Sequence, residues 1–525
     1  TINDASGNGA TLTLASPGAS GSLGANKALV LDGVVATVSS VTSTTADGSY
    51  KINTTIPIKV TFSEAVYVTG TPQLTLETGS SDAVVNYTSG SGSADLIFNY
   101  TVASGHTSSD LDYTSTSALA LNSGTIKDVV GNTSTLTLAS PGGTNSLGAN
   151  KALIIDTTVP TVASVTSTSS DGSYKVGDVI PIKVTFSEAV TVSGTPQLTL
   201  ETGSSDAVVN YTSGSGSADL IFNYTVAEGH VSSDLAYGST SALALNSGTI
   251  NDAASNAATL TLASPGASNS LSNSKALVID GVIPTVSSVT STTSNGTHKL
   301  GDVIAITVSF SETMTVTGTP QLTLETGSSD AAVNYASGSG SSTLTFNYTI
   351  GAGEASSDLD YASTSALALN GGTIKDGAGN AATLTLASPG ATNSLGANKA
   401  LVVDGIVPTV SSVTSTTSNG SYKVDEVIAI TVTFSEAVTV NTTNGTPQLT
   451  LETGSSDAVV NYASGTGGTT LTFNYTIASG HTSSDLDYAS TSALALNSGT
   501  IKDAAGNSAT LTLATPGQSN SLGAN

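Results

Sequence analysis

Apolar and polar residues alternate in short runs along most of this 525-residue chain. In the segment 179–186 every second residue is branched or aromatic, and the segments 197–200, 207–211, 219–226 and 258–262 repeat the pattern. A period of two is typical of a β-strand that buries one face. Turn residues separate the runs, as in GSSD at 203–206 and SGSGS at 213–217. No stretch has the 3.6-residue period of a helix, so the sequence predicts an all-β fold with essentially no helix.

The chain repeats itself four times. The segment TVSSVTST at Thr37 returns as TVASVTST at Thr161 and as TVSSVTST at Thr285 and Thr409, at a constant spacing of 124 residues. The fourth copy has a three-residue insertion near 441–444. Each copy has about seven or eight short strands, which is the pattern of a Greek-key β-sandwich. We therefore expect tandem sandwiches in a linear array.

The predicted domain boundaries follow from the repeat. Residues 1–33 match the C-terminal part of a preceding repeat, and four repeats follow at 34–157, 158–281, 282–405 and 406–525, the last without its final strand. Short linkers join them, and each of the last three linkers ends in a proline (Pro160, Pro284 and Pro408), where the first has Ala36. Proline fixes one backbone dihedral and restricts its neighbour, so we expect stiff joints there. Both ends fall inside a repeat, which suggests a window from a longer array and makes strand exchange between copies conceivable.

Composition narrows the function classes. The formal charge is -25 and the pI is near 4.1, so binding to nucleic acid is disfavoured. Cysteine is absent, which excludes disulfides and thiolate chemistry. No run approaches the roughly 18 apolar residues that a membrane span needs.

Three sequence blocks indicate a family. These are FSEAV, DxxGN, and a branched pair followed by Asp and then PTV. Together they resemble the bacterial Ig-like repeats of giant secreted adhesins and related surface proteins, over essentially the whole chain. The resemblance implies an extracellular stalk at the bacterial cell surface, and it implies Ca²⁺ at or near the domain junctions.

The acidic residues of these blocks form candidate metal sites. With strands that run up and down, the linker aspartate, the loop after the second strand and the loop between the last two long strands meet at one pole. Three carboxylates, with backbone carbonyls and Asn132, Asn256, Asn380 or Asn507, offer the oxygen ligands that Ca²⁺ prefers. The alternative is that these acids are ordinary solvated loop residues. The four predicted sets are Asp32, Glu64 and Asp128; Asp156, Glu188 and Asp252; Asp280, Glu312 and Asp376; and Asp404, Glu436 and Asp503.

A second acidic patch is a weaker candidate. Asp110 and Asp112 in SSDLDY recur in the third and fourth copies, but the second copy has Ala236 in place of the second aspartate. Catalysis has still less support. The segment GHTSSD holds His106, Ser108 and Asp110, but the third copy has Glu354 at the histidine position. Adjacency in sequence is also not the geometry of a triad.

The tyrosines raise the question of sugar binding. Tyr87, Tyr100 and Tyr113 recur in every copy, but the chain has no tryptophan platform. We therefore expect them to pack half-buried with a wet hydroxyl.

The sequence thus predicts a non-enzymatic, extended stalk or spacer of a bacterial surface protein, made rigid by calcium at its joints and used in adhesion or biofilm. The expected partners are the neighbouring repeats of the same chain. Two alternatives stay open: a subunit of a self-assembling surface filament or sheath, and a carbohydrate- or protein-binding adhesive module.

Overall fold

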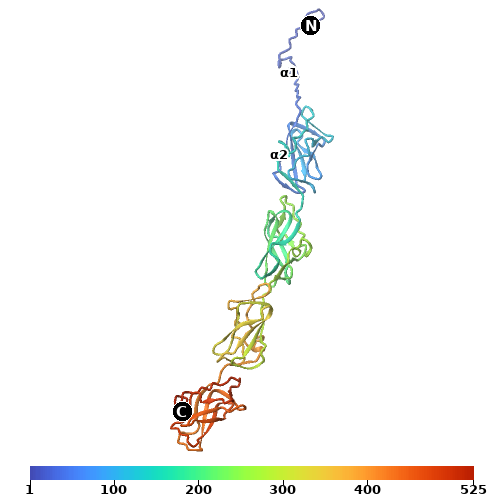
Figure 1. Ribbon diagram of the computed structural model, residues 1–525. Helices are drawn as coiled ribbons and strands as arrows, with labels where there is room; N and C mark the ends of the chain where they lie inside the picture. The colour runs from blue at the N-terminus through green and yellow to red at the C-terminus, as the bar shows by residue number, and fades with distance from the viewer. The chain divides into compact units, whose positions relative to one another are not determined.

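The computed structural model describes residues 1–525, the whole chain. It divides into two compact units. The first comprises Thr1–Gly172, Val179–Thr225 and Ser232–Val278, and the second comprises Ser173–Asp178, Val226–Val231 and Ile279–Asn525. The four sequence copies are called repeats 1 to 4, with the boundaries predicted above. Helices and strands are drawn in Figure 1, coloured from blue to red along the chain.

Repeat 2 has the strands of repeat 1 in the same order, with one additional short strand at Ala236–Tyr237. Repeat 1 contains β1 (Val38–Ser43), β2 (Gly48–Tyr50), β3 (Thr55–Thr69), β4 (Gln73–Leu76), β5 (Ala83–Ser89), β6 (Ser93–Thr101), β7 (Thr107–Ser108), β8 (Leu119–Ala120), β9 (Thr125–Lys127) and β10 (Leu153–Asp156). Repeat 2 contains β11 (Val162–Ser167), β12 (Gly172–Lys175), β13 (Val179–Ser193), β14 (Gln197–Glu201), β15 (Ala207–Ser213), β16 (Ser217–Thr225), β17 (Val231–Ser232), β18 (Ala236–Tyr237), β19 (Leu243–Ala244), β20 (Thr249–Asn251) and β21 (Leu277–Asp280).

Repeats 3 and 4 share the four long strands of the main sheet and differ in their short strands. Repeat 3 contains β22 (Val286–Ser291), β23 (Gly296–Lys299), β24 (Val303–Thr317), β25 (Gln321–Leu324), β26 (Ala331–Ser337), β27 (Ser341–Thr349), β28 (Ala355–Ser356), β29 (Leu367–Ala368), β30 (Thr373–Lys375) and β31 (Leu401–Asp404). Repeat 4 contains β32 (Val410–Ser415), β33 (Val427–Asn441), β34 (Gln448–Glu452), β35 (Ala458–Ser464), β36 (Gly468–Thr476), β37 (Asp487–Tyr488), β38 (Leu494–Ala495) and β39 (Thr500–Lys502).

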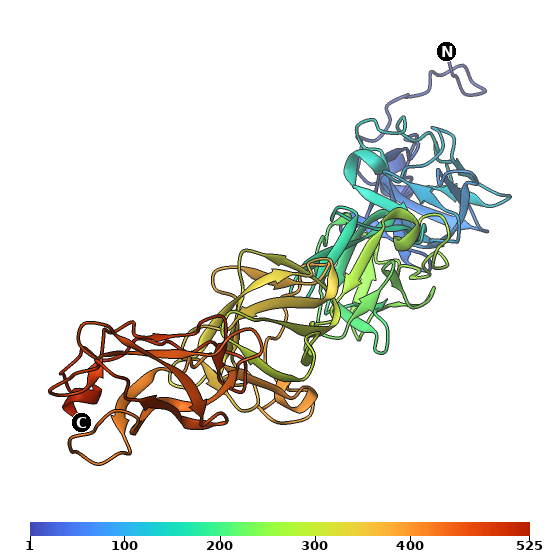
Figure 2. The same ribbon diagram turned by 60° about the horizontal axis from the view of Figure 1, so that its bottom comes forward.

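The strands form a main antiparallel sheet around a separate core in each repeat, and repeats 1 to 3 add a small mixed sheet. In repeat 2 the main order is β11-β13-β16-β15-β14-β18, and a small sheet has the order β12-β21-β17. The stretch β13-β16-β15-β14 is a Greek key, because three hairpin-connected strands are flanked by the strand that precedes them. The predicted all-β fold of tandem sandwich domains is confirmed. The strand arrows of repeat 4 can be followed in Figure 2 in orange and red.

The alternation seen in the sequence produces the core. Along β13 the residues Ile180, Ile182, Val184 and Phe186 are at most 2% exposed, and the residues between them face outward. A buried tyrosine closes the core of each repeat beside the short strands. The Tyr113 hydroxyl donates to the carbonyl of Ala139 at 2.8 Å, so this ring is buried with its polar end satisfied.

Two details of the predicted secondary structure are wrong. The segment 258–262 forms no strand, and only isolated bridges such as Thr161 to Thr259 connect it to the sheet. The sequence SLGAN, expected to be non-helical, makes one α-helical turn in three copies, and repeat 2 makes the same turn with SLSNS. The serine before each turn caps it, as Ser146 does for Ala149. The turns are α1 (Leu23–Asn26), α2 (Leu147–Asn150), α3 (Leu271–Ser274) and α4 (Leu395–Asn398), with a 3-10 turn, η1 (Leu522–Ala524), in repeat 4.

Candidate metal sites at the linkers

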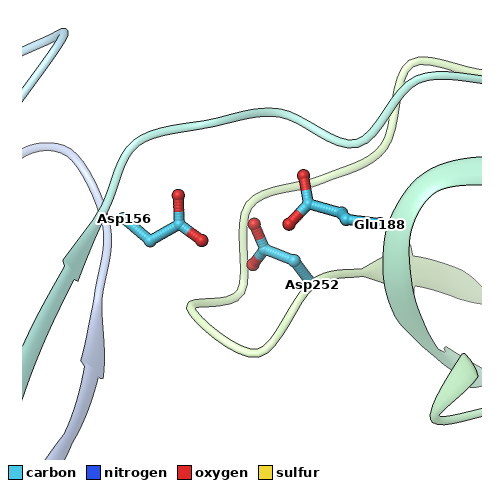
Figure 3. A group of neighbouring side chains, drawn as sticks. All are labelled: Asp156, Glu188 and Asp252. Atoms are coloured by element: carbon cyan, nitrogen blue, oxygen red, sulfur yellow. The ribbon is translucent and has the colours of Figure 1, made fainter. Parts of the chain in front are cut away.

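Three of the four predicted carboxylate sets come together in the structure. In each of them one oxygen from each residue lies within 4.8 Å of the other two. Figure 3 shows Asp156, Glu188 and Asp252 with their carboxylates turned toward one another. The three sets are Asp156, Glu188 and Asp252; Asp280, Glu312 and Asp376; and Asp404, Glu436 and Asp503.

The linker aspartate is held by the sheet that precedes it. Asp404 is the last residue of β31, which pairs in parallel with β23 and antiparallel with β28. Its backbone lies between Lys299 and Ala355 in that register. The next residue is tied as well, because the Gly405 N–H donates to the carbonyl of Glu354 at 2.7 Å. Asp404, the first carboxylate of the repeat 4 set, is therefore positioned by repeat 3.

The glutamate lies in a strand and not in the loop that the sequence predicted. Glu188 is inside β13, which continues to Ser193. The ladder between β13 and β16 shifts register between Thr185 and Val190, and such a bulge re-aims side chains. Beyond the bulge β13 pairs with β20, so the glutamate stands where the strand changes partner.

One oxygen of this glutamate has no hydrogen-bond donor. The Oε1 atoms of Glu188, Glu312 and Glu436 are buried and unpartnered, as is that of Glu64. Buried polar atoms are nearly always hydrogen-bonded, so an oxygen that accepts no bond from the protein is available to another partner. The neighbouring groups are carboxylates, which cannot supply a proton donor when ionised.

The third carboxylate is fixed by its own loop. Asp503 is 6% exposed, and its Oδ1 accepts the N–H groups of Gly506 and Asn507 at 2.7 and 2.8 Å. The Asn507 amide donates to Asp503 Oδ2 and to the carbonyl of Asp404, at 2.8 and 2.9 Å. Its Oδ1 accepts the N–H of Leu300, within the second unit. The asparagine that was predicted as an additional ligand thus ties the linker to the loop.

Burial and repulsion act together on the glutamates. The pKa of Glu188 is raised, first by burial and then by the charges of Asp156 and Asp252. The pKa values of Glu312 and Glu436 are raised for the same reasons, each with its own pair of aspartates. Each set therefore holds negative charge at a cost that a bound cation would remove.

The donor set fits a hard divalent cation. All three side chains offer carboxylate oxygen, the group that Ca²⁺ takes at flexible, multidentate sites. Neither histidine nor cysteine belongs to any of the three sets, so the softer ligands that favour zinc or copper are missing there. The three side chains would supply part of a calcium coordination shell, with backbone carbonyls and water as the usual remainder.

The set in repeat 1 is not one of these groups. Asp32 follows a segment that belongs to no strand, in which Leu29 and Leu31 are 66% and 96% exposed. Asp128 keeps its loop, since its Oδ1 accepts three backbone N–H groups. Glu64 and Asp128 thus have the same local structure as their counterparts in the other repeats. Asp32 differs, because the segment before it pairs with no strand.

In the second acidic patch, Asp112 holds a neighbouring loop through a hydrogen bond. Asp112 is buried, and its Oδ2 accepts the N–H of Gly142 at 2.8 Å. A Cβ on Gly148 would lie 3.0 Å from the same oxygen, so this aspartate requires a glycine in the helical turn. Repeat 2 has Ala236 and Ser272 at these two positions, a paired exchange that keeps the space filled.

The histidine and tyrosines have local packing roles. The Tyr100 hydroxyl and His106 Nδ1 are 2.9 Å apart, and the rings are stacked. In repeat 3 the Tyr348 hydroxyl donates to Glu354 Oε2 instead, at 2.6 Å. Tyr100 and Tyr113 are each 1% exposed, more buried than the sequence predicted.

Repeat 1 has an exposed apolar surface that the sequence reading missed. Tyr67 is 48% exposed and lines a groove of about 320 Å³ with Val129 and Val130, which are also exposed. The other copies have threonine at the tyrosine position, Thr191, Thr315 and Thr439. A comparison of the copies at exposed strand positions would have found it.

Comparison with known protein families supports the resemblance to bacterial Ig-like repeats. Residues 404–515 match the bacterial Ig-like domain family, which confirms the predicted resemblance, and no catalytic family is among the matches. No curated protein sequence matches the chain.

Several solved structures are similar in part. An I-band fragment of titin is 8% identical with a TM-score of 0.26, over 66% of this chain and 95% of titin's fragment. The S-layer protein rSbsC is 13% identical with a TM-score of 0.12, over 90% of this chain and 67% of that one. The α2-macroglobulin of E. coli is 9% identical with a TM-score of 0.14, over 87% of this chain and 28% of the macroglobulin. Similarities at this level lend no weight to a particular function.

None of the helices reaches the length and hydropathy of a membrane span.

Proposed function

We propose that this chain is a non-enzymatic structural repeat region of a bacterial extracellular surface protein, an extended stalk or spacer whose joints are stiffened by Ca²⁺. The chain would hold an adhesive or biofilm-forming part away from the cell surface. Tandem bacterial Ig-like domains are consistent with such an extracellular structural repeat.

One observation carries the calcium role. The glutamate of each set has a buried oxygen without a donor, and it faces two further carboxylates. A buried carboxylate oxygen that faces two further carboxylates and accepts no hydrogen bond from the protein is better suited to a cation than to an ordinary surface acid. A cation there would connect the linker aspartate to two groups of the following repeat, and it would restrict the bend of the joint.

Titration calorimetry tests the site directly. The wild-type chain should bind three Ca²⁺ ions, one for each set. Glu312→Gln should remove one ion, since an amide oxygen is a weaker ligand without charge. Glu325→Gln is the matched control, because Glu325 is an exposed glutamate in the same repeat. Three ions in Glu312→Gln would refute the assignment, as would no binding by the wild type.

Small-angle scattering tests the mechanical role. The wild-type chain in Ca²⁺ should show a narrower distribution of dimensions than in chelator. The triple variant Glu188→Gln, Glu312→Gln, Glu436→Gln should scatter alike in both conditions. An unchanged maximum dimension for the wild type would leave binding without stiffening.

A second candidate, an adhesive module, is favoured by the groove on repeat 1. Tyr67 offers an exposed aromatic face beside two valines, which suits a sugar ring or an apolar side chain. Titration with soluble oligosaccharides, followed by NMR at the methyl groups of Val129 and Val130, tests it, with Tyr67→Thr as the variant that copies the other repeats. Equal shifts in both proteins would refute a site there.

A further inference from the structure

The side chain of Asn507 connects repeat 3 to repeat 4. Its Oδ1 accepts the N–H of Leu300 at 2.9 Å. Its Nδ2 donates to the carbonyl of Asp404 and to Asp503 Oδ2, at 2.9 and 2.8 Å. Leu300 lies in the turn between β23 and β24, Asp404 ends β31, and Asp503 follows β39. Three segments from two repeats therefore meet at one amide group.

This amide is buried and has partners on both of its polar atoms. Asn507 is only 4% exposed. Because an amide has a fixed donor and acceptor side, hydrogen bonds to both sides also fix its orientation. The same contact occurs once more within the second unit, where the Val176 N–H donates to Asn380 Oδ1 at 2.9 Å. The bond between a turn and the asparagine of the following repeat is thus a recurring feature.

The joint between repeats 1 and 2 has a different contact. Asn256 keeps its bonds to the carbonyl of Asp156 and to Asp252 Oδ2, at 3.0 and 2.8 Å. However, no hydrogen bond joins its Oδ1 to the N–H of Ile52, the counterpart of Leu300. The bond across this joint runs from Lys51 Nζ to the carbonyl of Ser255, at 3.0 Å.

The sequence of the turn explains why the lysine is available there. In repeat 3 the Lys299 Nζ pairs with Asp302 inside its own turn, at 3.3 Å. Repeat 1 has Thr54 at the position of the aspartate, so Lys51 has no acidic partner in its turn. The lysine ammonium sits on a flexible four-carbon stem. A contact made by such a stem can follow a change of joint angle, whereas one between a backbone N–H and a buried amide cannot.

We propose that Asn507 is a positioning residue that fixes the joint of repeats 3 and 4 without metal, through the turn 299–302. The joint of repeats 1 and 2 has only the lysine contact, and it depends on its cation for stiffness. The second statement rests on the proposed calcium role, and the first does not. The chain would then combine a permanently stiff joint with one that stiffens only in Ca²⁺.

The donor of this contact can be removed with little change to the turn. The Asp302 N–H donates to the carbonyl of Lys299 at 3.0 Å, and Gly301 has a φ of 84°. Leu300 has no positive φ, so the turn is of type II, in which proline is favoured at the second position. Leu300→Pro therefore deletes the N–H and keeps the turn, and Leu300→Ala shortens the side chain and keeps the N–H.

A matched control exists in repeat 1. Its turn has the same form, since the Thr54 N–H donates to the carbonyl of Lys51 at 3.2 Å and Asn53 has a φ of 69°. Ile52→Pro thus removes an N–H that makes no bond across the joint. The converse variant is Asn53→Gly/Thr54→Asp/Ser255→Gly, which gives the joint of repeats 1 and 2 the residues of the joint of repeats 3 and 4.

Distances between spin labels, measured by double electron–electron resonance, report the spread of joint angles. The chain has no cysteine, so Ser337→Cys/Ser464→Cys labels repeats 3 and 4 alone, and Ser89→Cys/Ser213→Cys labels repeats 1 and 2. All four serines are exposed.

In chelator, the distance distribution of the wild type should be narrower across repeats 3 and 4 than across repeats 1 and 2. Leu300→Pro should broaden the former to the width of the latter, with a melting temperature like that of Leu300→Ala. Leu300→Ala and Ile52→Pro should each leave the width at their own joint unchanged. The converse variant should narrow the distribution across repeats 1 and 2.

Equal widths at the two wild-type joints in chelator would overturn the proposal, as would an unchanged width in Leu300→Pro. An unchanged width in the converse variant would contradict the explanation of the difference. These outcomes do not depend on the calcium sites, because no free Ca²⁺ is present. Addition of Ca²⁺ should then narrow the distribution across repeats 1 and 2 only. Its failure to do so would refute the dependence on a cation and leave the role of Asn507 intact.

Discussion

The poles of repeat 1 and repeat 4 carry the same three acidic residues, yet the structure assembles only one set. Asp404, Glu436 and Asp503 converge within 4.8 Å, whereas Asp32, Glu64 and Asp128 do not form such a group. Glu64 and Glu436 each have one buried oxygen without a hydrogen-bond partner. Asp128 and Asp503 each accept backbone N–H groups of their own loop in the same way. The difference therefore lies in the linker aspartate.

The comparison teaches that each site belongs to a joint and not to a single domain. Asp404 is the end of a paired strand, while Asp32 follows 27–31, which has no strand beside it. A repeat thus supplies two of the three carboxylates, and the strand before it fixes the position of the third.

The largest expected effect tests what the two poles have in common. Asp503→Ala would leave the donors of Gly506 and Asn507 unsatisfied in a buried loop, and the cost should be about 3 kcal/mol of unfolding free energy. Asp128→Ala should cost nearly as much, because its loop is bonded alike. Urea unfolding of both variants provides the measurement, and a much smaller cost at Asp128 would mean that the loops are not equivalent.

The next prediction breaks the comparison at the linker glycine. A Cβ on Gly405 would lie 2.1 Å from the carbonyl oxygen of Gly351, whereas nothing lies within 4 Å of one on Gly33. Gly405→Ala should cost about 1–3 kcal/mol through overpacking, and Gly33→Ala should be nearly neutral. Calcium binding at the repeat 4 set should weaken in the first variant only. Equal stability of the two variants would contradict the proposed role of the preceding sheet.

A pH series sharpens the electrostatic part. The pKa of Glu436 is raised from 4.5 by burial and then by Asp404 and Asp503. Without metal, this group's contribution to stability is fully present below 4.5 and is lost as the pH rises through the folded-state pKa. Glu436→Gln in chelator should therefore gain stability relative to wild type as the pH rises, measured by thermal unfolding. With Ca²⁺ the order should reverse at neutral pH, since the ion needs the ionised carboxylate.

The smallest effect concerns Ala36, which is buried where the other linkers have proline. The carbonyls of Ala36 and Pro160 accept the same kind of bond, from Thr135 and Thr259 at 2.9 and 2.8 Å. Ala36→Pro should therefore fit and should stabilise by about 0.4–1 kcal/mol through the unfolded state. It should not create a fourth ion site in the monomer, since it supplies no strand for Asp32; calorimetry checks this.

Much of the fold was predictable because a period of two records which face of a strand is buried. Ile182 and Phe186 identify the core of repeat 2 without any structure. The position of Glu188 was not predictable in this way, because a bulge leaves the strand continuous and changes its partner, which the pattern does not record. The short turn at Ser146 was missed because one turn is shorter than the period that identifies a helix.

For the candidate sites too, part of the arrangement was predictable from the sequence and part was not. Sequence reasoning grouped Asp280, Glu312 and Asp376 correctly in space, since the three segments that carry them meet at one pole of the sandwich. The same reasoning grouped Asp32 with Glu64 and Asp128, because residue identity does not show whether a strand lies beside 27–31. Likewise, the dependence of Asp112 on Gly148 is visible in sequence only as a difference between copies.

The placement of β31 has a consequence for a molecule under tension. Force that enters repeat 4 through its linker pulls β31 along its own axis, between β23 on one side and β28 on the other. The hydrogen bonds on both flanks are then sheared together and do not open one after another. A strand held in this way resists extraction better than one whose hydrogen bonds open one at a time from its end.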